Sequence, residues 1–417
     1  MRKNMIVTLK DITTKITKGT TPTSIGCKFE KSGINFIKSE SLVDGKTIDK
    51  SKFAFISERT HERLKRSQIE ENDILFSMAG MFLGKTGIAT AEVVPANTNQ
   101  AVAIIRVDDT KANYEYVYYY LNQKSVIHTI NTTSAQSAQP NINLKQIGKI
   151  KINLPNRKKQ DQIVSLLSAI DLKISNNVEI NDNLLEQIRT LCTAWLSDYK
   201  PFDGAVPSDW VETPLSDIAE FVSGYSYKGS ELTDSTIAMA TIKNFDRKGG
   251  FKLDGYKEII PSSKLKESQH AELFDTLVAH TDLTQNAEVI GNAEPVMSKS
   301  GYDDIIFSMD LVKVLPKKEN VSKFLLAAIL QDKKFKAHCL GYVNGTTVLH
   351  LSKKALPEYK LFLPSDLSKL RPLDEIVTTL YKQISSNISE NTYLEELRVA
   401  LLPKLMSGEL DVSGIDL

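Results

Sequence analysis

Cysteine and histidine are scarce in this chain, which has 3 cysteines and 6 histidines among 417 residues. The cysteines, Cys27, Cys192 and Cys339, form no CxxC pair, and their odd number argues against a secreted disulfide framework. No cysteine or histidine has the spacing of a metal site, so no metal ligand is assigned. The first residues lack the apolar core of a signal peptide, and no apolar run reaches membrane-spanning length. We therefore expect a soluble, cytoplasmic protein.

The sequence also lacks the common catalytic signatures. HExxH, GxSxG, a GxGxxG that opens a helix, and the adenine-methylating Asn/Asp-Pro-Pro-Tyr/Phe are all missing, so no catalytic residue is assigned. One stretch, Ala79 to Thr86, fits a loose phosphate-binding loop, which must follow a strand and open a helix. The residues after it include Gly87 and Pro95 among β-branched residues and do not resemble a helix. The chain is therefore predicted to be a binder, with nucleotide hydrolysis as a minor alternative that Lys85→Ala would test.

Charge is nearly balanced over the whole chain, at +1, but it is unevenly distributed. Residues 1–155 carry 22 Lys and Arg against 14 Asp and Glu, a net +8, whereas residues 207–364 carry 19 against 21, a net −2. A basic region of this size can sit on a phosphate backbone, whereas the second region would need a local positive face. Charge therefore permits nucleic acid as a partner without requiring it.

A seam of apolar residues with two embedded asparagines occurs twice, at a spacing of about 3.5 residues. The first copy runs from Ile163 to Trp195, and adding 210 to each number gives the second copy, from Leu373 to Leu405. A seam of this period requires a partner helix, and its duplication in one chain indicates that the two helices pair with each other. The second helix is expected to end or kink at Pro403.

The asparagines of the two seams occupy matching places near the middle of each helix. If the helices are antiparallel and in register, Asn177 faces Asn391 and Asn181 faces Asn387. Buried amides that face each other satisfy their hydrogen bonds, whereas an amide facing leucine loses its water without gaining a partner. We therefore predict that these four residues pair the helices and fix their register. The alternative is that they lie on solvated faces.

A large unit precedes each seam helix, and the two units repeat the same order of segments. Residues 1–155 hold strand-like segments such as INFI, DILFSM and AVAIIRV, a helix at YEYVYYYLNQ and a closing strand KIKINLP. Residues 207–364 follow the same route through IAMATIK, DTLVAH, DLVKVL, the helix SKFLLAAILQ and the strand EYKLFLP. The tyrosines from Tyr114 to Tyr120 could stack bases, but at helical spacing they are predicted to pack a helix against a sheet. The sequence thus predicts an α+β fold in which two duplicated α/β domains are separated by two long helices that form an intramolecular antiparallel coiled coil.

Polar loops fall at equivalent places in the two units. Glutamine, asparagine, serine, threonine and lysine are side chains that read base edges and hold phosphates, so these loops are the candidate DNA contacts. The candidates in the first unit are Lys18, Thr20, Thr21, Ser77, Lys85, Ser134, Gln136, Gln139 and Asn141. The candidates in the second unit are Tyr225, Tyr227, Lys228, His280, Thr281, Thr284, Gln285, Asn286, Asn344, Thr346 and Thr347. Each loop alone is compatible with an ordinary surface, and the repetition favours a shared role.

Taken in order, these features resemble the specificity subunit of type I restriction-modification systems over nearly the whole chain. The resemblance is carried by LPNRKKQDQIVSLLSAID, by KISNNVEINDNLLEQ with its echo QISSNISENTYLEEL, by VPSDWVETPLSDI, by DILFSMAGMFLGKTGIA and LVAHTDLTQNAEVIG, and by LLPKLMSGEL. It implies target recognition domains at 1–155 and 207–364, a conserved spacer helix at 156–200, a linker at 201–206, and a second conserved spacer helix with the C-terminal tail at 365–417.

The resemblance implies a non-catalytic, sequence-specific subunit in which each domain reads one half of a split target in double-stranded DNA. The spacer helices would set the gap between the half-sites. Two methyltransferase subunits would dock on this framework and restriction subunits would join them, so S-adenosylmethionine, ATP and Mg would be bound in the partner subunits and not by this chain. The assembled complex would be an adenine-specific DNA methyltransferase and an ATP-dependent endonuclease.

Two alternatives stay open. One is the recognition subunit of a related system whose partner chain fuses methyltransferase and nuclease. The other is a two-headed protein-protein scaffold that binds no DNA, which the near-neutral charge favours. Salt dependence separates this scaffold from a DNA binder, because phosphate binding weakens steeply with ionic strength.

Overall fold

The computed structural model shows a chain of mixed helices and strands. The residues that it describes are 5–43, 45–134, 141–247, 249–284 and 286–412. Within this part of the chain, no helix combines the length and the apolar character that crossing a membrane requires.

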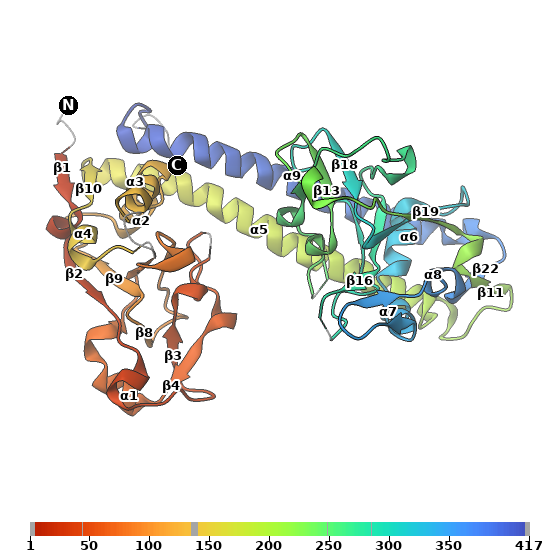
Figure 1. The fold of residues 1–417 in the computed structure, drawn as a ribbon, viewed down its shortest axis with the longest axis horizontal. Coiled ribbons are helices and arrows are strands. Elements are labelled where there is room, and N and C mark those ends of the chain that lie inside the picture. The colour runs from red at the N-terminus through yellow and green to blue at the C-terminus, as the bar shows by residue number, and fades with distance from the viewer. Residues whose placement is uncertain (1–4, 44, 135–140, 248, 285, 413–417) are drawn as a thin grey trace. The chain divides into compact units, whose positions relative to one another are not determined.

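The chain divides into two compact units, each of which includes part of both long helices. Unit 1 comprises Met1–Leu172 together with Glu395–Leu417, and unit 2 comprises Lys173–Leu394. The long helices α5 (Arg157–Leu196) and α9 (Arg371–Ser407) pack together, as the yellow-green and blue ribbons in Figure 1 show. Each of these helices therefore begins in one unit and ends in the other. The domain boundaries expected from the sequence stay a prediction.

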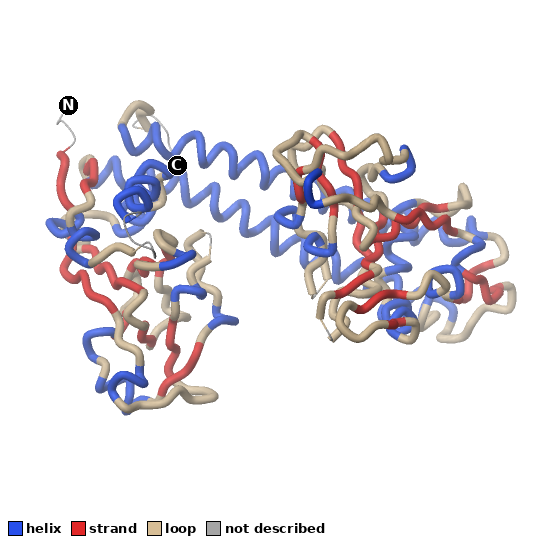
Figure 2. The backbone as a smooth tube through the Cα atoms, viewed as in Figure 1, coloured by secondary structure: helices blue, strands red, loops and turns tan. Residues whose placement is uncertain are grey.

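The described residues of unit 1 form two sheets, a two-stranded ribbon and several short helices (Figure 2). The first sheet is antiparallel, with the order β2 (Thr13–Lys18), β9 (Val102–Val107), β6 (Ile74–Ser77) and β7 (Thr86–Ile88). The second sheet has the order β4 (Ala54–Ile56), β3 (Ile34–Ile37), β8 (Ala96–Thr98) and β5 (Gln68–Ile69). The ribbon pairs β1 (Met5–Thr8) with β10 (Lys151–Leu154). The short helices are α1 (Glu58–Arg63), α2 (Tyr114–Leu121), α3 (Lys124–Ser134) and α4 (Leu144–Gly148).

The described residues of unit 2 repeat this plan. The first sheet has the order β12 (Ala219–Ser223), β19 (Leu311–Pro316), β15 (Thr276–Ala279) and β17 (Ala293–Pro295). The second has the order β14 (Lys257–Glu258), β13 (Ile237–Ala240) and β18 (Asp304–Phe307), and a third has β16 (Thr281–Asp282), β21 (Leu349–Leu351) and β20 (Val343–Asn344). A ribbon pairs β11 (Trp210–Pro214) with β22 (Lys360–Pro364). The short helices are α6 (Lys323–Leu330), α7 (Lys333–Leu340) and α8 (Ala355–Glu358).

The main sheets and the second sheets have matching strand orders in the two units, whereas a third sheet occurs, among the described residues, in unit 2 alone. In unit 1 the edge strand β2 follows β1 in the sequence and lies beside β9, which precedes α2. In unit 2 the edge strand β12 follows β11 and lies beside β19, which precedes α6. Each second sheet contains one parallel pair, β3 with β8 in unit 1 and β13 with β18 in unit 2, and an antiparallel edge strand. The duplication expected from the sequence is therefore confirmed in the strand pairing.

Helix α2 places its tyrosines in the core of unit 1. Asn113 caps the helix by accepting hydrogen bonds from the N–H groups of Glu115 (2.8 Å) and Tyr116 (3.3 Å). Tyr116 and Tyr119 are buried in one cluster with side chains of β6, β9 and α5, and the Tyr116 hydroxyl donates a 2.6 Å hydrogen bond to Asn153 O in β10. Burial raises the pKa of both hydroxyls well above the usual range of tyrosine. These tyrosines pack a helix against a sheet, as predicted.

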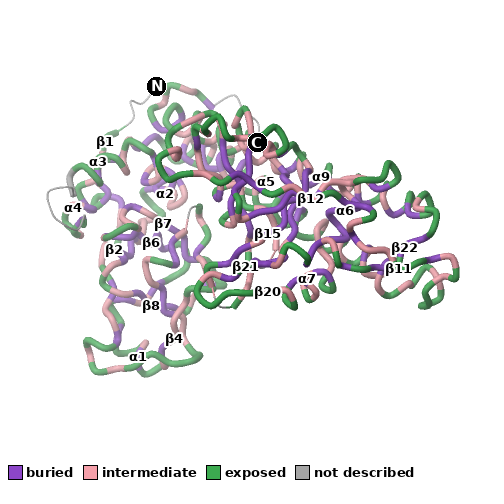
Figure 3. The backbone as a smooth tube through the Cα atoms, turned by 45° about the vertical axis from the view of Figure 1, so that its right-hand side comes forward, coloured by how far each residue is buried: buried purple, intermediate pink, exposed green. Residues whose placement is uncertain are grey.

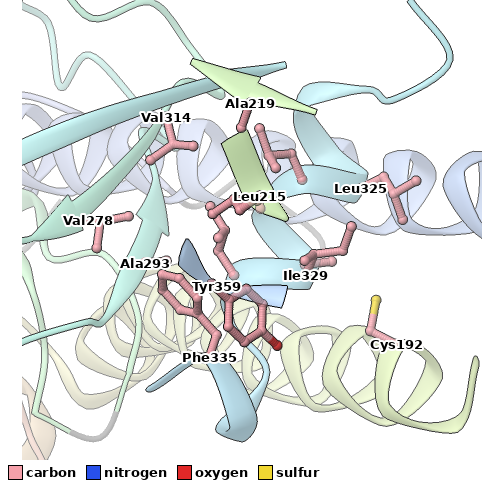
Figure 4. Packing of buried hydrophobic residues seen from close by; sticks show 14 of the residues in the cluster. Cys192, Leu215, Ala219, Val278, Ala293, Val314, Leu325, Ile329, Phe335 and Tyr359 are labelled. Atoms are coloured by element: carbon pink, nitrogen blue, oxygen red, sulfur yellow. The ribbon is translucent and has the colours of Figure 1, made fainter. Parts of the chain in front are cut away.

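The core of unit 2 gathers side chains from the main sheet, the short helices and both long helices (Figure 4). Phe335 of α7 and Tyr359 meet edge to face, with ring centroids 5.1 Å apart. Leu215 and Ile329 belong to the same buried cluster. Cys192 of α5 is buried beside them, and burial raises the pKa of its thiol to about 12. This thiol stays protonated at neutral pH and serves as a small apolar side chain.

Helix α9 runs through Pro403 to Ser407, so the proline does not end it. Proline has no N–H, so the carbonyl of Val399 receives no helix hydrogen bond from position 403. Val399 is 47% exposed, which lets water reach this turn. Gly408 follows with a φ of 82°, the left-handed conformation that glycine adopts readily after a helix, and its N–H donates a 3.2 Å hydrogen bond to Leu405 O.

The asparagines of the two seams pair across α5 and α9 within unit 2. Asn177 Nδ2 donates a 2.8 Å hydrogen bond to Asn391 Oδ1, and Asn387 Nδ2 donates a 2.8 Å hydrogen bond to Asn181 Oδ1. The two pairs run in opposite directions along the helices, so the helices are antiparallel and in the register predicted. Asn177 Nδ2 also donates to Glu390 Oε2, whereas Asn177 Oδ1 has no partner in the described residues. Such pairs specify register at a cost in stability.

A polar network joins the same two helices within unit 1. Arg398 of α9, which interrupts the second seam, donates a 2.8 Å hydrogen bond to Asp171 Oδ1 of α5. Asp171 also accepts a 2.5 Å hydrogen bond from the Tyr119 hydroxyl of α2. Lys46 Nζ lies 2.5 Å from Glu115 Oε2 and 3.9 Å from Asp171 Oδ2. Arg398 therefore replaces an apolar seam contact with an ion pair that ties α9 to α5.

Replacing Asn177 by leucine is expected to lower the stability of unit 2 by about 1–3 kcal/mol, because the Asn391 amide then faces an apolar side chain. The double substitution Asn177→Leu with Asn391→Leu is expected to recover that loss, because no buried amide is left unpaired. Urea denaturation followed by tryptophan fluorescence measures the effect on unit 2 alone, since Trp195 and Trp210, the chain's 2 tryptophans, both belong to it.

The matched control is Asn176→Leu, because Asn176 is the exposed neighbour on α5. Equal effects of Asn176→Leu and Asn177→Leu would contradict the pairing. An additive double mutant, with both losses summed, would contradict it as well.

Candidate nucleic-acid interface

A glycine follows the first strand of the main sheet in each unit and brings the chain against a neighbouring strand. A Cβ atom on Gly19 would lie 1.9 Å from Thr98 O, and one on Gly224 would lie 2.0 Å from Ser308 O. Neither position accepts a larger residue unless the backbone shifts. The same tight turn therefore positions the candidate residues that follow each glycine.

In unit 1 this turn presents polar and basic side chains together. Lys18 ends β2 and is exposed. Thr20 Oγ1 accepts a 3.2 Å hydrogen bond from Arg66 Nη2, and the Thr21 hydroxyl contacts Gln100 Oε1. The residues of one sequence-predicted loop are thus joined by Arg66 and Gln100, which come from two other segments.

A second arginine lies close by in sequence and in the fold. Arg63, the last residue of α1, donates 3.1 Å hydrogen bonds to Cys27 Sγ and to Ile25 O. A thiol, a backbone carbonyl and the Thr20 hydroxyl are all neutral, so these contacts orient Arg63 and Arg66 without neutralising them. Lys18, Arg63 and Arg66 are called the basic cluster below. Oriented guanidinium groups of this kind can donate bidentate hydrogen bonds to a phosphate or to the edge of a guanine base.

The loop after β6 brings three further candidates together. Ser77 N–H donates a 2.8 Å hydrogen bond to Lys85 O, and Gly84 N–H donates a 3.0 Å hydrogen bond to Ser77 O. Asn141 is exposed, and its backbone bridges Ala79 at the start of the loop. The Ser77 side chain is fully buried, and its hydroxyl has no partner in the described residues. Ser77 therefore supports the loop, whereas Lys85 and Asn141 lie nearer the solvent.

The stretch from Ala79 to Thr86 does not have the form of a nucleotide-binding loop. Gly80–Phe82 forms a short 3-10 turn, and Thr86 then begins strand β7. Thr86 is buried, and its hydroxyl donates a 2.9 Å hydrogen bond to Asn122 Oδ1. A phosphate-binding loop opens a helix whose amino end faces the phosphate, and a strand stands in that place here.

Tyr225, the counterpart of Thr20 in unit 2, is enclosed. Its hydroxyl donates a 2.8 Å hydrogen bond to Glu231 Oε1 and accepts one of 3.1 Å from Ser262 N–H. Hydrogen bonds from Lys228 N–H, Tyr225 and Ser262 lower the pKa of Glu231 to about 2. Tyr225 therefore braces this turn, while Tyr227 is half-buried and Lys228 is exposed.

The third sheet of unit 2, formed by β16, β21 and β20, brings together candidates from distant loops. In it β21 lies between β16 and β20, so that His350 is paired with both Thr281 and Asn344. The Thr281 hydroxyl donates a 2.9 Å hydrogen bond to Asp310 Oδ1. Thr281 itself is buried, whereas Asn344 and His350 are exposed. Thr346 and Thr347 lie on the exposed segment between β20 and β21 (Figure 3).

His280 borders this sheet and lines a cleft of about 470 Å³. The cleft is also lined by His350, Lys353 and the exposed Met309. Burial lowers the pKa of His280, the positive groups of His350 and Lys353 lower it further, and Asp310 opposes them. His280 is therefore neutral at pH 7, with one ring nitrogen that accepts and one that donates a hydrogen bond.

A buried carboxylate organises the loop after β16. Asp282 accepts hydrogen bonds from Thr284 N–H (2.8 Å), the Thr284 hydroxyl (2.9 Å) and Val289 N–H (2.9 Å). Burial would raise the pKa of Asp282, but these hydrogen bonds and the nearby Arg247 lower it below its usual value. Asn286 is exposed on this loop. Thr284 is thus already engaged within the loop, and Asn286 is the freer of the two.

Four candidates remain outside this description. Gln136, Gln139 and Gln285 lie outside the described residues, and so does the side chain of Ser134, the last residue of α3. Their contacts with DNA stay predictions. The same holds for the DNA contacts of all the candidates placed above.

A second buried carboxylate, Glu294 of β17, joins three parts of unit 2. Its Oε1 accepts a 2.7 Å hydrogen bond from Gly250 N–H, and its Oε2 accepts one of 3.0 Å from Gln331 at the end of α6. Burial raises the pKa of Glu294 to about 7, and the hydrogen bonds and Arg189 of α5 only partly counter it. The other charged or titratable groups that face it are Asp246, Lys336 and Tyr381.

Unit 2 is expected to lose stability as the pH rises from about 4.5 to about 7. A carboxyl whose folded pKa is raised binds its proton more tightly in the folded state, so its contribution is complete below 4.5 and lost by about 7. The full difference is of order 3 kcal/mol. Glu294→Gln removes the titrating group and is expected to flatten this pH dependence.

Urea denaturation at pH 5, 6, 7 and 8, followed by tryptophan fluorescence, measures this change in unit 2. Glu186→Gln, an exposed carboxylate on α5, is the matched control and should leave the slope as in the parent. An unchanged slope in Glu294→Gln would contradict the assignment.

Sequence reasoning missed two residues that the structure brings to these loops. Arg66 contacts Thr20 from 46 residues away, and His350 lies opposite Thr281 in the third sheet of unit 2. The only sequence signal for Arg66 is the local run of basic residues around it. His350 carries none, because its place depends on the pairing of β21.

Comparison with known proteins places these features in context. Residues 1–187 match the family model described as type I restriction modification DNA specificity domain. The chain is 23% identical over 344 residues to the type I restriction enzyme MjaIX specificity subunit of Methanocaldococcus jannaschii, covering 77% of this chain and 74% of that protein. It is 22% identical over 355 residues to the HindI specificity subunit of Haemophilus influenzae, covering 71% and 77%.

A solved structure with this fold comes from another specificity subunit. The S subunit of the type I restriction-modification system from M. genitalium aligns over 96% of each chain with a TM-score of 0.52 and 17% sequence identity. At this identity the likeness concerns the fold alone. It extends over both units and both long helices, because it covers nearly the whole chain.

Proposed function

The chain belongs to the family of type I restriction-modification specificity subunits, and we propose that it reads a bipartite DNA target, one half-site with each unit. A specificity subunit is a non-catalytic recognition subunit, so the chemistry of such a system resides elsewhere. What remains for this chain is to bind DNA, to select a sequence and to carry partners.

One observation carries the proposal: the two units repeat one scaffold but present different side chains at the same turn. In unit 1, Arg66 donates to the Thr20 hydroxyl beside the glycine turn. In unit 2, Gln269 Nε2 reaches the matching turn and donates a 3.0 Å hydrogen bond to Gly224 O. Tyr225 takes the place of Thr20. A repeated frame with exchanged polar groups is what two readers of different half-sites require, since base edges are distinguished by donor and acceptor pattern.

The first unit would supply most of the attraction to phosphate. Residues 1–155 have a net charge of +8, and the basic cluster of Lys18, Arg63 and Arg66 adjoins the candidate turn. Phosphate contacts fix the protein on the duplex, and base contacts then select the sequence. In unit 2 the neutral His280 with the exposed Asn344 and Asn286 would read base edges by hydrogen bonding.

The long helices would set the distance between the half-sites. Each begins in one unit and ends in the other, and α5 has 40 residues, a length of about 60 Å at about 1.5 Å per residue. A stiff connection of fixed length suits two modules that read a duplex at a fixed spacing. The paired asparagines would keep that spacing constant by preventing slip.

Two methyltransferase subunits and restriction subunits are the proposed protein partners. They would bind S-adenosylmethionine, ATP and Mg, and the complex would methylate adenine and cleave DNA in an ATP-dependent reaction. We expect the assembly to act in the cytoplasm. A partner chain with fused methyltransferase and nuclease is the second candidate arrangement, and the framework in this chain would serve either.

The observation that favours a scaffold without DNA is the charge of residues 207–364, a net −2. A scaffold would bind a protein through apolar contacts that respond little to salt. A DNA binder releases counterions from phosphate, so its affinity falls steeply with salt. The two functions therefore differ in a quantity that is simple to measure.

The full chain is expected to bind a random-sequence duplex library with an affinity that falls linearly on a plot of log affinity against log salt. Arg63→Ala with Arg66→Ala should lower the affinity and make the slope less negative by about 2, because two phosphate contacts are lost. Lys158→Ala, an exposed cation in the first turn of α5, is the matched control. No binding to any duplex would refute the proposal and favour the scaffold, and duplex binding that ignores salt would contradict phosphate contacts as the source of the affinity.

Shortening both helices by one heptad is expected to shorten the gap in the target. Deleting residues 174–180 and 388–394 removes facing stretches that include the Asn177 and Asn391 pair and keeps the Asn181 and Asn387 pair. The rod loses about 10 Å, about three base pairs at about 3.4 Å each. Sequencing the duplexes that parent and variant select measures the gap. Selection of an unchanged gap would contradict the ruler.

A further inference from the structure

Two large aliphatic side chains are exposed to solvent in loops that hold candidate DNA contacts. Met81 is 89% exposed and Leu283 is 68% exposed. Such exposure gives up the stabilisation that burial brings. A single exposed aliphatic residue is ordinary on a protein surface, so either one alone would mean little.

The two residues occupy equivalent positions in the duplicated fold. Strand β6 ends at Ser77, opposite the first residue of β9, and strand β15 ends at Ala279, opposite the first residue of β19. Met81 and Leu283 each lie four residues beyond these strand ends. Their neighbours differ in sequence, so the shared feature is an exposed aliphatic side chain at one place in each unit.

In unit 1 the tip is held by its own backbone. Leu83 N–H donates a 3.0 Å hydrogen bond to Gly80 O, and Lys85 N–H donates a 3.0 Å hydrogen bond to Phe82 O. The base of the loop is closed where Gly84 N–H meets the last strand residue at 3.0 Å. These hydrogen bonds hold the backbone of the loop that carries Met81.

In unit 2 the loop that carries Leu283 is held by a side chain, the carboxylate of Asp282. The buried Asp282 accepts hydrogen bonds from the N–H groups of Thr284 and Val289, which both follow Leu283 in the chain. Leu283 follows Asp282 directly and lines a cleft of about 540 Å³ with Lys243. Hydrogen bonds thus hold described backbone next to both side chains, which lowers the entropy lost on binding.

We propose that Met81 and Leu283 are wedges that insert between stacked base pairs, one in each half of the DNA target. Methionine and leucine are among the side chains that proteins drive between base steps, and the partial unstacking kinks the duplex. The inference rests on the proposed function, because it takes duplex DNA as the ligand and deepens how each half-site is read.

The surroundings of the tips favour a base step over a protein partner. Each aliphatic residue lies within four positions of polar candidates in the sequence, with Lys85 in unit 1 and Thr284 and Asn286 in unit 2. A stable protein interface buries about 800 Å² on each partner, far more than one side chain offers. A single apolar group among hydrogen-bonding groups fits the gap between two stacked bases, whose faces are apolar and whose edges are polar.

A wedge also adds selectivity that no hydrogen bond supplies. Pyrimidine–purine steps unstack more easily than other steps, so inserting a side chain costs least there. Each half-site is therefore expected to contain such a step at a fixed place, even if no polar side chain reads it. Met81 and Leu283 would thus determine specificity by deformability.

The test uses the full chain and duplexes that it enriches from a random-sequence library. The base 2-aminopurine, whose fluorescence rises when it unstacks, replaces adenine at each adenine of either strand of the enriched sequence in turn. The parent should raise the fluorescence at one step in each half-site. Met81→Ser should abolish the rise in one half-site only, Leu283→Ser in the other only, and each should weaken binding about tenfold.

Conservative and salt-dependence controls separate a wedge from a merely structural residue. Met81→Leu and Leu283→Met should keep the fluorescence rise, and the serine variants should keep the salt slope of the parent, because no phosphate contact is lost. Serine variants should also unfold as the parent does, since both side chains are exposed. Enriched duplexes that show no unstacking with the parent, or that show it unchanged with the serine variants, would overturn the wedges and leave the proposed function standing. A chain that enriches no duplex would overturn both.

Discussion

Two hydrogen-bonded asparagine pairs hold α5 and α9 in one antiparallel register, and the cores of both units depend on it. Leu405 and Met406 of α9 lie in the core of unit 1, while Leu373 and Val377 of the same helix lie in the core of unit 2. A slip of α9 along α5 would withdraw apolar side chains from both cores at once. Apolar seams alone tolerate a slip by a heptad, because leucine packs on leucine in many registers, whereas a buried amide must meet another polar group.

The two units share a buried frame and differ in their loops. This difference explains how one scaffold can serve two recognition tasks. The strand order and the glycine turns beside Thr98 and Ser308 are common to both units, and they leave little room for variation. The side chains that the turns and loops present differ in charge and hydrogen-bonding type. Substitution in the loops leaves the buried frame intact, so each unit's specificity can change without loss of its fold.

Local and repeated features of the chain could be predicted from its sequence, and features that depend on distant segments could not. The seam, the amide pairing and the packing of α2 follow from spacing alone. Ser77 and Tyr225 read as polar loop residues, yet strand pairing and the Glu231 carboxylate enclose them. Arg66 and His350 were missed for the converse reason, since only the fold brings them to their loops. Exposure of a loop side chain is thus a property of the tertiary structure.

Burial also changes how the net charge of residues 207–364 should be interpreted. Residues 207–364 have a net charge of −2, but Asp275, Asp282 and Glu294 are buried and Lys313 is the buried cation among them. Asp275 is ion-paired with Lys313 and with Lys323, and the other two carboxyls hold backbone N–H groups. Apart from these four residues, residues 207–364 carry 18 Lys and Arg and 18 Asp and Glu. A region without net exposed charge neither attracts nor repels phosphate at long range, so in the proposed function residues 207–364 would discriminate by short-range contacts while the basic residues 1–155 attract the duplex.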